Sequence, residues 1–104
     1  MVKSAKFSLY WDAEATAQLE EILSFLAKRS HIAPRIVKNA VFSRVKELQY
    51  MPFQAEPDEL RRPKNDFFRA VVVFSYRITY QIVPDVNEIR ILRIRHASRE
   101  PLNY

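Results

Sequence analysis

Three strand-like runs follow one another closely in the last third of the chain. They are rich in β-branched and aromatic residues and lie at Phe68–Phe74, Tyr76–Val83 and Glu88–Arg95. One residue separates the first two runs, and four residues separate the last two. Connections this short join neighbouring antiparallel strands, whereas a parallel pair needs a crossover of roughly a dozen residues or more. The sequence therefore predicts a three-stranded antiparallel meander.

The first half of the chain predicts a short strand followed by two helices. Lys6–Tyr10 is the candidate strand, and Asp12 is the candidate N-cap of the first helix. Apolar residues then recur at helical spacing, at Ala15, Leu19, Ile22, Leu23 and Leu26 and, after Pro34, at Val37, Val41, Val45 and Leu48. Because few residues connect the two helices, we expect an antiparallel hairpin whose apolar stripes cover the sheet.

Two residue types are missing from the chain, and their absence excludes whole classes of site. Without cysteine there can be no disulfide and no thiolate metal site. Without glycine, the Walker A and dinucleotide-binding loops are excluded. The two histidines, His31 and His96, lack metal-ligand spacing, so no metal and no cofactor is expected. Positions with positive φ must then be taken by Asn or Asp, for example near Asp85 and Asn87.

The length of the chain, 104 residues, predicts a single domain over residues 1–104. The N-terminal segment has no apolar core of the kind found in signal peptides, and no apolar run reaches membrane-spanning length. The expected location is therefore the cytoplasm.

The excess positive charge lies in one part of the chain. Residues 1–60 carry 8 Lys and Arg and 8 Asp and Glu, whereas residues 61–104 carry 9 and 4, which accounts for the net charge of +5. Such a basic region is either a solvated face or a docking surface for nucleic acid or an acidic partner. The arginines recur on predicted strands beside aromatic residues, which favours the docking surface.

Several motifs, in this order, resemble the RelE/ParE superfamily, the toxins of type II bacterial toxin–antitoxin systems. They are AEATAQLEEILSFLAKRS in the first predicted helix, FRAVVVFSYRITYQIV in the first hairpin and EIRILRIRHASRE at the last strand. The run YRITY looks like the family's central strand, and His96-x-x-Arg99-Glu100 is similar to its closing motif. The resemblance implies an α+β fold, in which an N-terminal strand and an antiparallel helical hairpin pack on a three- to four-stranded antiparallel sheet.

The resemblance also implies a function. A cognate antitoxin, acidic in such systems, would wrap the helical hairpin and the sheet, and the toxin would arrest growth and stabilise a plasmid. ParE-like members poison DNA gyrase and replication, whereas RelE-like members cut messenger RNA on the ribosome without a metal. The two long helices and the apolar run Ala70–Val73 favour the ParE-like branch. An mRNA endoribonuclease is the first alternative, and a non-toxic binding module of the same fold is the second.

The candidate site residues follow from the resemblance and from their chemistry: Arg69, Arg77, His96, Arg99 and Tyr104. In a nuclease the arginines would hold the phosphate and His96 would move a proton; in a gyrase poison the same residues would contact the target. RelE-like nucleases carry lysines where this chain has Arg69-Ala70-Val71, and no carboxylate is placed as a base. His96 as a purely structural residue, and an ion pair of Arg77 with Asp85 or Glu88, are the simpler alternatives.

Overall fold

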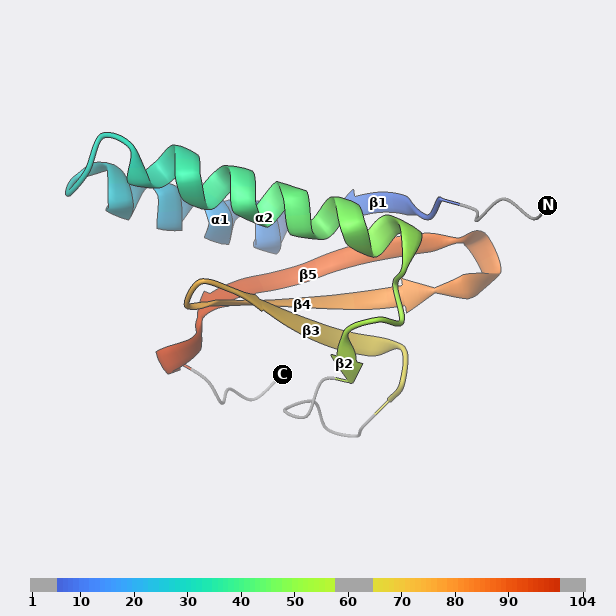
Figure 1. The fold of residues 1–104 in the computed structure, drawn as a ribbon. Coiled ribbons are helices and arrows are strands. Elements are labelled where there is room, and N and C mark those ends of the chain that lie inside the picture. The colour runs from blue at the N-terminus through green and yellow to red at the C-terminus, as the bar shows by residue number, and fades with distance from the viewer. Residues whose placement is uncertain (1–5, 58–64, 100–104) are drawn as a thin grey trace.

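The protein is described here by a computed structural model, which covers residues 6–57 and 65–99. The elements in chain order are β1 (Ser8–Trp11), α1 (Ala13–Ala27), α2 (Ala33–Tyr50), β2 (Glu56–Pro57), β3 (Phe68–Val73), β4 (Tyr76–Val83), the 3₁₀ turn η1 (Pro84–Val86), β5 (Glu88–His96) and the 3₁₀ turn η2 (Ala97–Arg99). Figure 1 shows two layers, with both helices on one face of the sheet. The predicted α+β fold with a helical hairpin on a sheet is confirmed.

The sheet has the strand order β1-β5-β4-β3-β2. Strands β3, β4 and β5 form the predicted antiparallel meander. The sheet as a whole is mixed, because β1 runs parallel to β5, and the two-residue strand β2 extends it at the other edge. A parallel pair needs a long connection, and the helical hairpin together with the meander supplies one. The direction of a four-residue strand is set by this tertiary arrangement and leaves no pattern in the strand itself.

The helices begin and end close to the predicted positions. Asp12 precedes α1 as its N-cap residue, although its side chain makes no capping hydrogen bond. Before α2, the hydroxyl of Ser30 accepts hydrogen bonds from the backbone N–H groups of Ile32 and Ala33, at 3.2 and 3.1 Å. Pro34 then occupies the first turn, where its missing N–H leaves no helical bond unmade.

The core lies between the helical layer and the sheet. The buried helix residues are Ala15, Leu19, Val37, Val41, Val45 and Leu48, all from the predicted apolar stripes. They pack with buried residues of the meander, chiefly Val71, Val73, Ile78, Tyr80, Ile82, Ile89, Ile91 and Ile94. Burial on this scale stabilises the fold by about 1.5–3 kcal/mol for each fully buried large side chain. The prediction that the sheet covers both stripes is confirmed.

Candidate functional site

The register of the meander sorts its side chains onto two faces. Directly paired residues of antiparallel strands point to the same face, and successive residues point to opposite faces. The pair Val71 and Ile78 is buried under the helices, which defines the helix-side face. One residue further along, Val72 pairs with Arg77 on β4, and Arg77 pairs with Arg95 on β5. This row of Val72, Arg77 and Arg95 therefore lies on the opposite face, which we call the outer face.

Arg69 lies on the helix-side face, since it pairs with the buried Tyr80. Its guanidinium donates hydrogen bonds to the carbonyl of Asp66 at 2.7 Å and to the carbonyl of Ala55 at 2.8 Å. The same group stacks over the ring of Phe53, 5.2 Å from its centroid. Arg69 thus joins the start of β3 to the segment that follows α2, and two of its donors are used in doing so.

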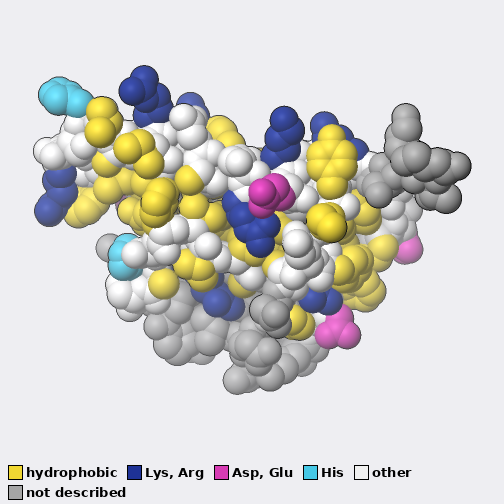
Figure 2. Space-filling view, viewed as in Figure 1, with side chains coloured by type: hydrophobic (Ala, Val, Ile, Leu, Met, Phe, Trp, Pro, Cys, Tyr) yellow, Lys and Arg dark blue, Asp and Glu magenta, His cyan; other side chains and the backbone are white. Residues whose placement is uncertain are grey.

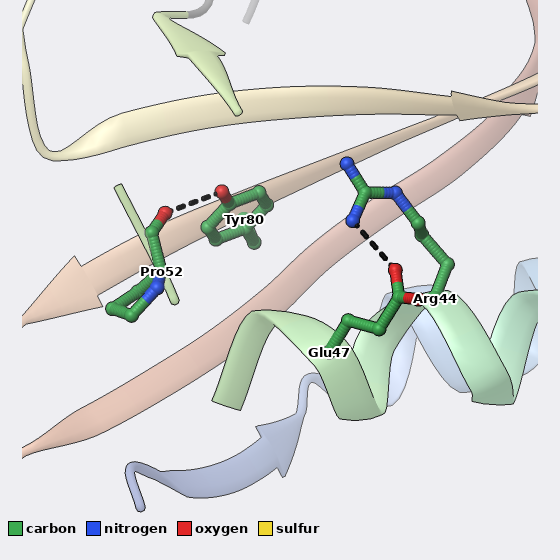
Figure 3. Close-up of polar contacts among 4 residues, drawn as sticks. All are labelled: Arg44, Glu47, Pro52 and Tyr80. Carbon is green, nitrogen blue, oxygen red and sulfur yellow. Dashed lines mark hydrogen bonds and ion pairs between the residues drawn. The ribbon is translucent and has the colours of Figure 1, made fainter. Parts of the chain in front are cut away.

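Tyr80 is hydrogen-bonded to the same segment, which follows α2, from inside the core. Its hydroxyl donates a 2.7 Å hydrogen bond to the carbonyl of Pro52 (Figure 3). Burial raises the pKa of Tyr80 to about 12, although the positive charges of Arg69 and Arg44 act in the opposite direction. The phenol therefore stays protonated at physiological pH and holds the carbonyl. Arg44 itself forms an exposed ion pair with Glu47 at 2.9 Å, one turn apart on α2.

His96 lies at the end of β5, opposite Tyr76 and on the helix-side face. The two rings meet edge to face, with their centroids 5.5 Å apart. His96 Nδ1 accepts a hydrogen bond from the backbone N–H of Ser98 at 3.2 Å and lies 2.8 Å from the Ser98 hydroxyl. These contacts fix the imidazole in the turn that follows β5.

A groove of about 470 Å³ lies between α1 and this end of the sheet. Its lining combines apolar and polar side chains: Gln18, Glu21, Ile22, Phe25, Tyr76, Ile94, Arg95, His96 and Ser98. Figure 2 shows hydrophobic side chains gathered along the helical layer above the sheet. Strand β1 pairs with β5 only as far as Ile91, and further along the side chain of Gln18 accepts a 2.8 Å hydrogen bond from the backbone N–H of Ile94. The groove therefore borders the edge of β5 beyond Ile91, where Gln18 supplies the hydrogen-bond acceptor that a neighbouring strand would otherwise provide.

The predicted site residues do not form one cluster in the described part of the chain. Arg77 is on the outer face, whereas His96 and Arg69 are on the helix-side face. The cross-strand partners of Arg69 and His96 are four residues apart on β4, or about 13 Å at the usual strand rise. The side chain of Arg99 and the whole of Tyr104 fall outside the described residues. Their roles, like those of the other three, stay predictions.

The alternative ion pair of Arg77 with Glu88 is wrong. Glu88 pairs with Val83, six residues further along β4 than Arg77, and this corresponds to about 20 Å. Its carboxylate contacts Arg90 instead, at 3.4 Å. Among the described residues of the outer face near the β3–β4 turn, Arg77 and Arg95 lie side by side, and Arg93 is in the next row, opposite Thr79.

Phe74 was missed by the sequence prediction. It follows β3 in a two-residue turn to β4 and has φ = 55°, in the left-handed region. That region costs a side chain with a Cβ about 1–2 kcal/mol and is a clear outlier for a bulky residue. The second positive φ belongs to Asn87, as predicted. The sequence prediction placed Phe74 within the strand, so the two-residue turn that requires a positive φ was not anticipated.

The described residues offer no site for a metal ion, because no three His, Cys, Asp or Glu side chains gather among residues 6–57 and 65–99. Within the same ranges, no helix is both long enough and apolar enough to cross a membrane. The outer face near the β3–β4 turn combines the half-buried arginines Arg77, Arg93 and Arg95 with the exposed Val72, without an acid–base pair among its described residues.

Comparison with known structures supports the architecture. The toxin–antitoxin complex RelBE2 from Mycobacterium tuberculosis aligns with a TM-score of 0.65 and 20% identity, over 90% of this chain and 94% of that one. A chromosomal ParDE toxin–antitoxin system from P. aeruginosa aligns with a TM-score of 0.70 and 22% identity, over 89% of this chain and 98% of that one. At this level of identity the likeness concerns the fold. No curated protein sequence matches the chain significantly.

The sequence itself carries the family assignment. The family described as the ParE toxin of type II toxin–antitoxin systems, parDE, matches residues 9–101. This range includes both helices, the whole meander and the arginines of the outer face. The protein therefore belongs to the ParE toxin family, within the RelE/ParE superfamily of type II toxin–antitoxin toxins.

Proposed function

We propose that this protein arrests bacterial growth by binding and inhibiting DNA gyrase, and that a cognate antitoxin neutralises it. The observation that carries the proposal is the separation of Arg69 from Arg77 and His96 onto opposite faces or distant rows of the sheet. A nuclease must bring a base, an acid and cations to one phosphate. A toxin that acts by binding needs only a surface, and the ParE family match favours this kind of action.

Ribosome-dependent cleavage of messenger RNA is the second candidate. It is favoured by the adjacent arginines Arg77 and Arg95, because guanidinium groups bind phosphate bidentately. In this case His96, Arg99 and Tyr104 would have to act near the same phosphate.

The antitoxin is expected to use the groove between α1 and the end of β5. Both aligned structures are toxin–antitoxin systems, which supports a protein partner for this chain. The apolar part of the groove, formed by Ile22, Phe25 and Tyr76, suits the side chains of a segment that folds on binding, and Arg95 suits its carboxylates. Both partner and target would then act inside the bacterial cell.

A paired assay tests the function. Purified toxin is added to DNA gyrase with relaxed plasmid, and separately to ribosomes programmed with messenger RNA. Lost supercoiling or trapped gyrase–DNA breaks, with intact RNA, is the expected result. Codon-specific cuts with normal supercoiling would instead establish the nuclease. Co-expression of the small acidic protein encoded beside the toxin should restore growth.

A further inference from the structure

The β3–β4 turn carries a residue that the fold itself does not favour. Phe74 has φ = 55°, and its side chain is 62% exposed. A glycine would adopt the same backbone without the steric cost, and an asparagine would adopt it at a lower cost than phenylalanine. At the other end of β4, the equivalent need is met by Asn87, with φ = 50°. A strained aromatic that faces solvent gains little from packing within its own chain, so the reason for it has to be sought outside the chain.

The surroundings of Phe74 indicate what it meets. Val72 precedes it on β3 and is 56% exposed, and the row across the sheet continues from Val72 to Arg77 and Arg95. We call Val72, Phe74, Arg77 and Arg95 the hairpin patch. Phe74 is exposed, whereas Arg77 and Arg95 are half-buried. Aromatic and arginine side chains are the residue types that dominate binding energy at protein interfaces. Apolar residues make up half of the patch, which suits a protein surface better than a phosphate backbone.

The positive charge of the chain further limits the kind of partner that the hairpin patch would bind. The chain carries a net charge of +5, all of it from residues 61–104, and the arginines of β4 and β5 lie next to the turn. On the outer face of the described strands, the carboxylate of Glu88 is at the far end of β5, against Arg90. A complementary surface would offer carboxylates beside an apolar pocket that receives the ring of Phe74.

We propose that the hairpin patch is the surface through which the toxin binds its protein target, with Phe74 inserted into an apolar pocket of that target. The inference rests on the proposed function, since it requires a toxin that acts by binding. The target would meet the outer face and the turn, whereas the antitoxin would meet the groove beside α1, and Arg95 borders both surfaces.

The central test replaces Phe74 with asparagine. Phe74→Asn keeps the positive φ accessible and removes the ring. We expect the concentration needed to inhibit gyrase supercoiling to rise by about 30-fold, the size expected for an interface hot spot. Growth arrest on induced expression should be lost in parallel. Phe74→Tyr, which keeps the aromatic ring, should retain most of both effects.

The matched control is an apolar residue that is as exposed as Phe74 but lies in another turn. Val86 is also 62% exposed and lies in the turn between β4 and β5, at the opposite end of β4. Val86→Asn should inhibit gyrase and arrest growth as the unchanged protein does. Equal loss in Val86→Asn and Phe74→Asn would overturn the proposal, because it would show that any polar substitution in a turn has this effect.

Thermal unfolding separates binding from folding. Relief of the left-handed strain should leave the melting temperature of Phe74→Asn unchanged or raise it by about 4 °C or more. A loss of activity at undiminished stability supports the patch. Undiminished activity of Phe74→Asn in both assays overturns it, whatever the stability.

The remaining outcomes distinguish this inference from the proposed function. If the unchanged protein inhibits gyrase and Phe74→Asn inhibits it equally, the inference fails and the proposed function stands. If the unchanged protein arrests growth without inhibiting gyrase, the proposed function fails, and loss of arrest in Phe74→Asn still supports a target contact at the patch. The inference would also be overturned if Phe74→Asn no longer captured the antitoxin but still arrested growth. Binding of the protein to a fluorescent DNA duplex alone, if this binding depended on Phe74, would overturn the inference too.

Discussion

The arginines on the two faces of the sheet differ in what lies beside their side chains. On the helix-side face, Arg69 is tied to the carbonyls of Asp66 and Ala55 and stacks on Phe53. On the outer face, Arg77 and Arg95 lie side by side across two strands, where like charges oppose each other. The first arrangement stabilises the chain, and the second is part of the proposed hairpin patch. What an arginine contacts in this fold therefore depends on the face that it occupies.

The largest effect should come from Arg69. In Arg69→Met, the carbonyls of Asp66 and Ala55 lose their charged donor, so the free energy of unfolding should fall by about 3 kcal/mol. Urea denaturation measures the change. The matched control is Arg90→Met, on the outer face, for which the fall should stay below about 0.5 kcal/mol. Equal losses at the two positions would remove the distinction between the faces.

The next effect concerns pH and Tyr80. The pKa of Tyr80 in the folded protein is about 12, against 10.0 for an ordinary tyrosine. Between these values the unfolded chain releases a proton that the folded chain keeps, so stability is complete below about pH 10 and falls as pH rises towards 12. The loss should be on the order of 2–3 kcal/mol.

Denaturation measured across this pH range, together with the ultraviolet absorbance of phenolate, provides the test. Tyr80→Phe should lose about 1 kcal/mol at neutral pH with its hydrogen bond to Pro52 and should show a weaker decline in alkali. An identical alkaline decline in both proteins would show that another group is responsible.

The hydrogen bond of the Gln18 side chain on the helix-side face should make a smaller contribution to stability. In Gln18→Leu, the backbone N–H of Ile94 would lose its acceptor at the edge of β5. We expect the free energy of unfolding to fall by about 1 kcal/mol, and the exchange of the Ile94 amide hydrogen to become faster. Gln18→Glu keeps an acceptor and serves as the control. Unchanged amide exchange in Gln18→Leu would mean that water or another group replaces the side chain.

Much of the fold could be predicted because its signals are local. Helical periodicity identified both apolar stripes, and short connections identified the meander. The faces of the candidate residues depend on register, which shifts every side chain to the other face if it slips by one residue. We expected a strand to Phe74 and a one-residue connection, whereas β3 ends at Val73 and the turn has two residues. That single residue decides that Arg77 shares a face with Val72 and not with Arg69.

Other features could not be found in the sequence. The pairing of β4 with β5 shifts register between Thr79 and Tyr80, and no sequence pattern marks this irregularity. The parallel pairing of β1 with β5 depends on how the helices pack. The partners of Arg69 are backbone carbonyls, and these carry no residue-specific signal. An arginine on a predicted strand is therefore a site candidate until its face and its partners are known.

The smallest expected effect, at Arg95, is the sharpest test of the comparison. Its Nε is buried without a hydrogen-bond partner among the described residues, and Arg77 lies directly opposite. Arg95→Gln removes one of two neighbouring charges, so the free energy of unfolding should change by less than about 0.5 kcal/mol and should rise slightly at low salt, where the repulsion is least screened. Urea denaturation at low and high salt measures both terms. A fall in the free energy of unfolding as large as that of Arg69→Met would mean that Arg95, too, stabilises the fold. The outer face would then resemble the helix-side face, and the distinction between a stabilising and a binding face would be wrong.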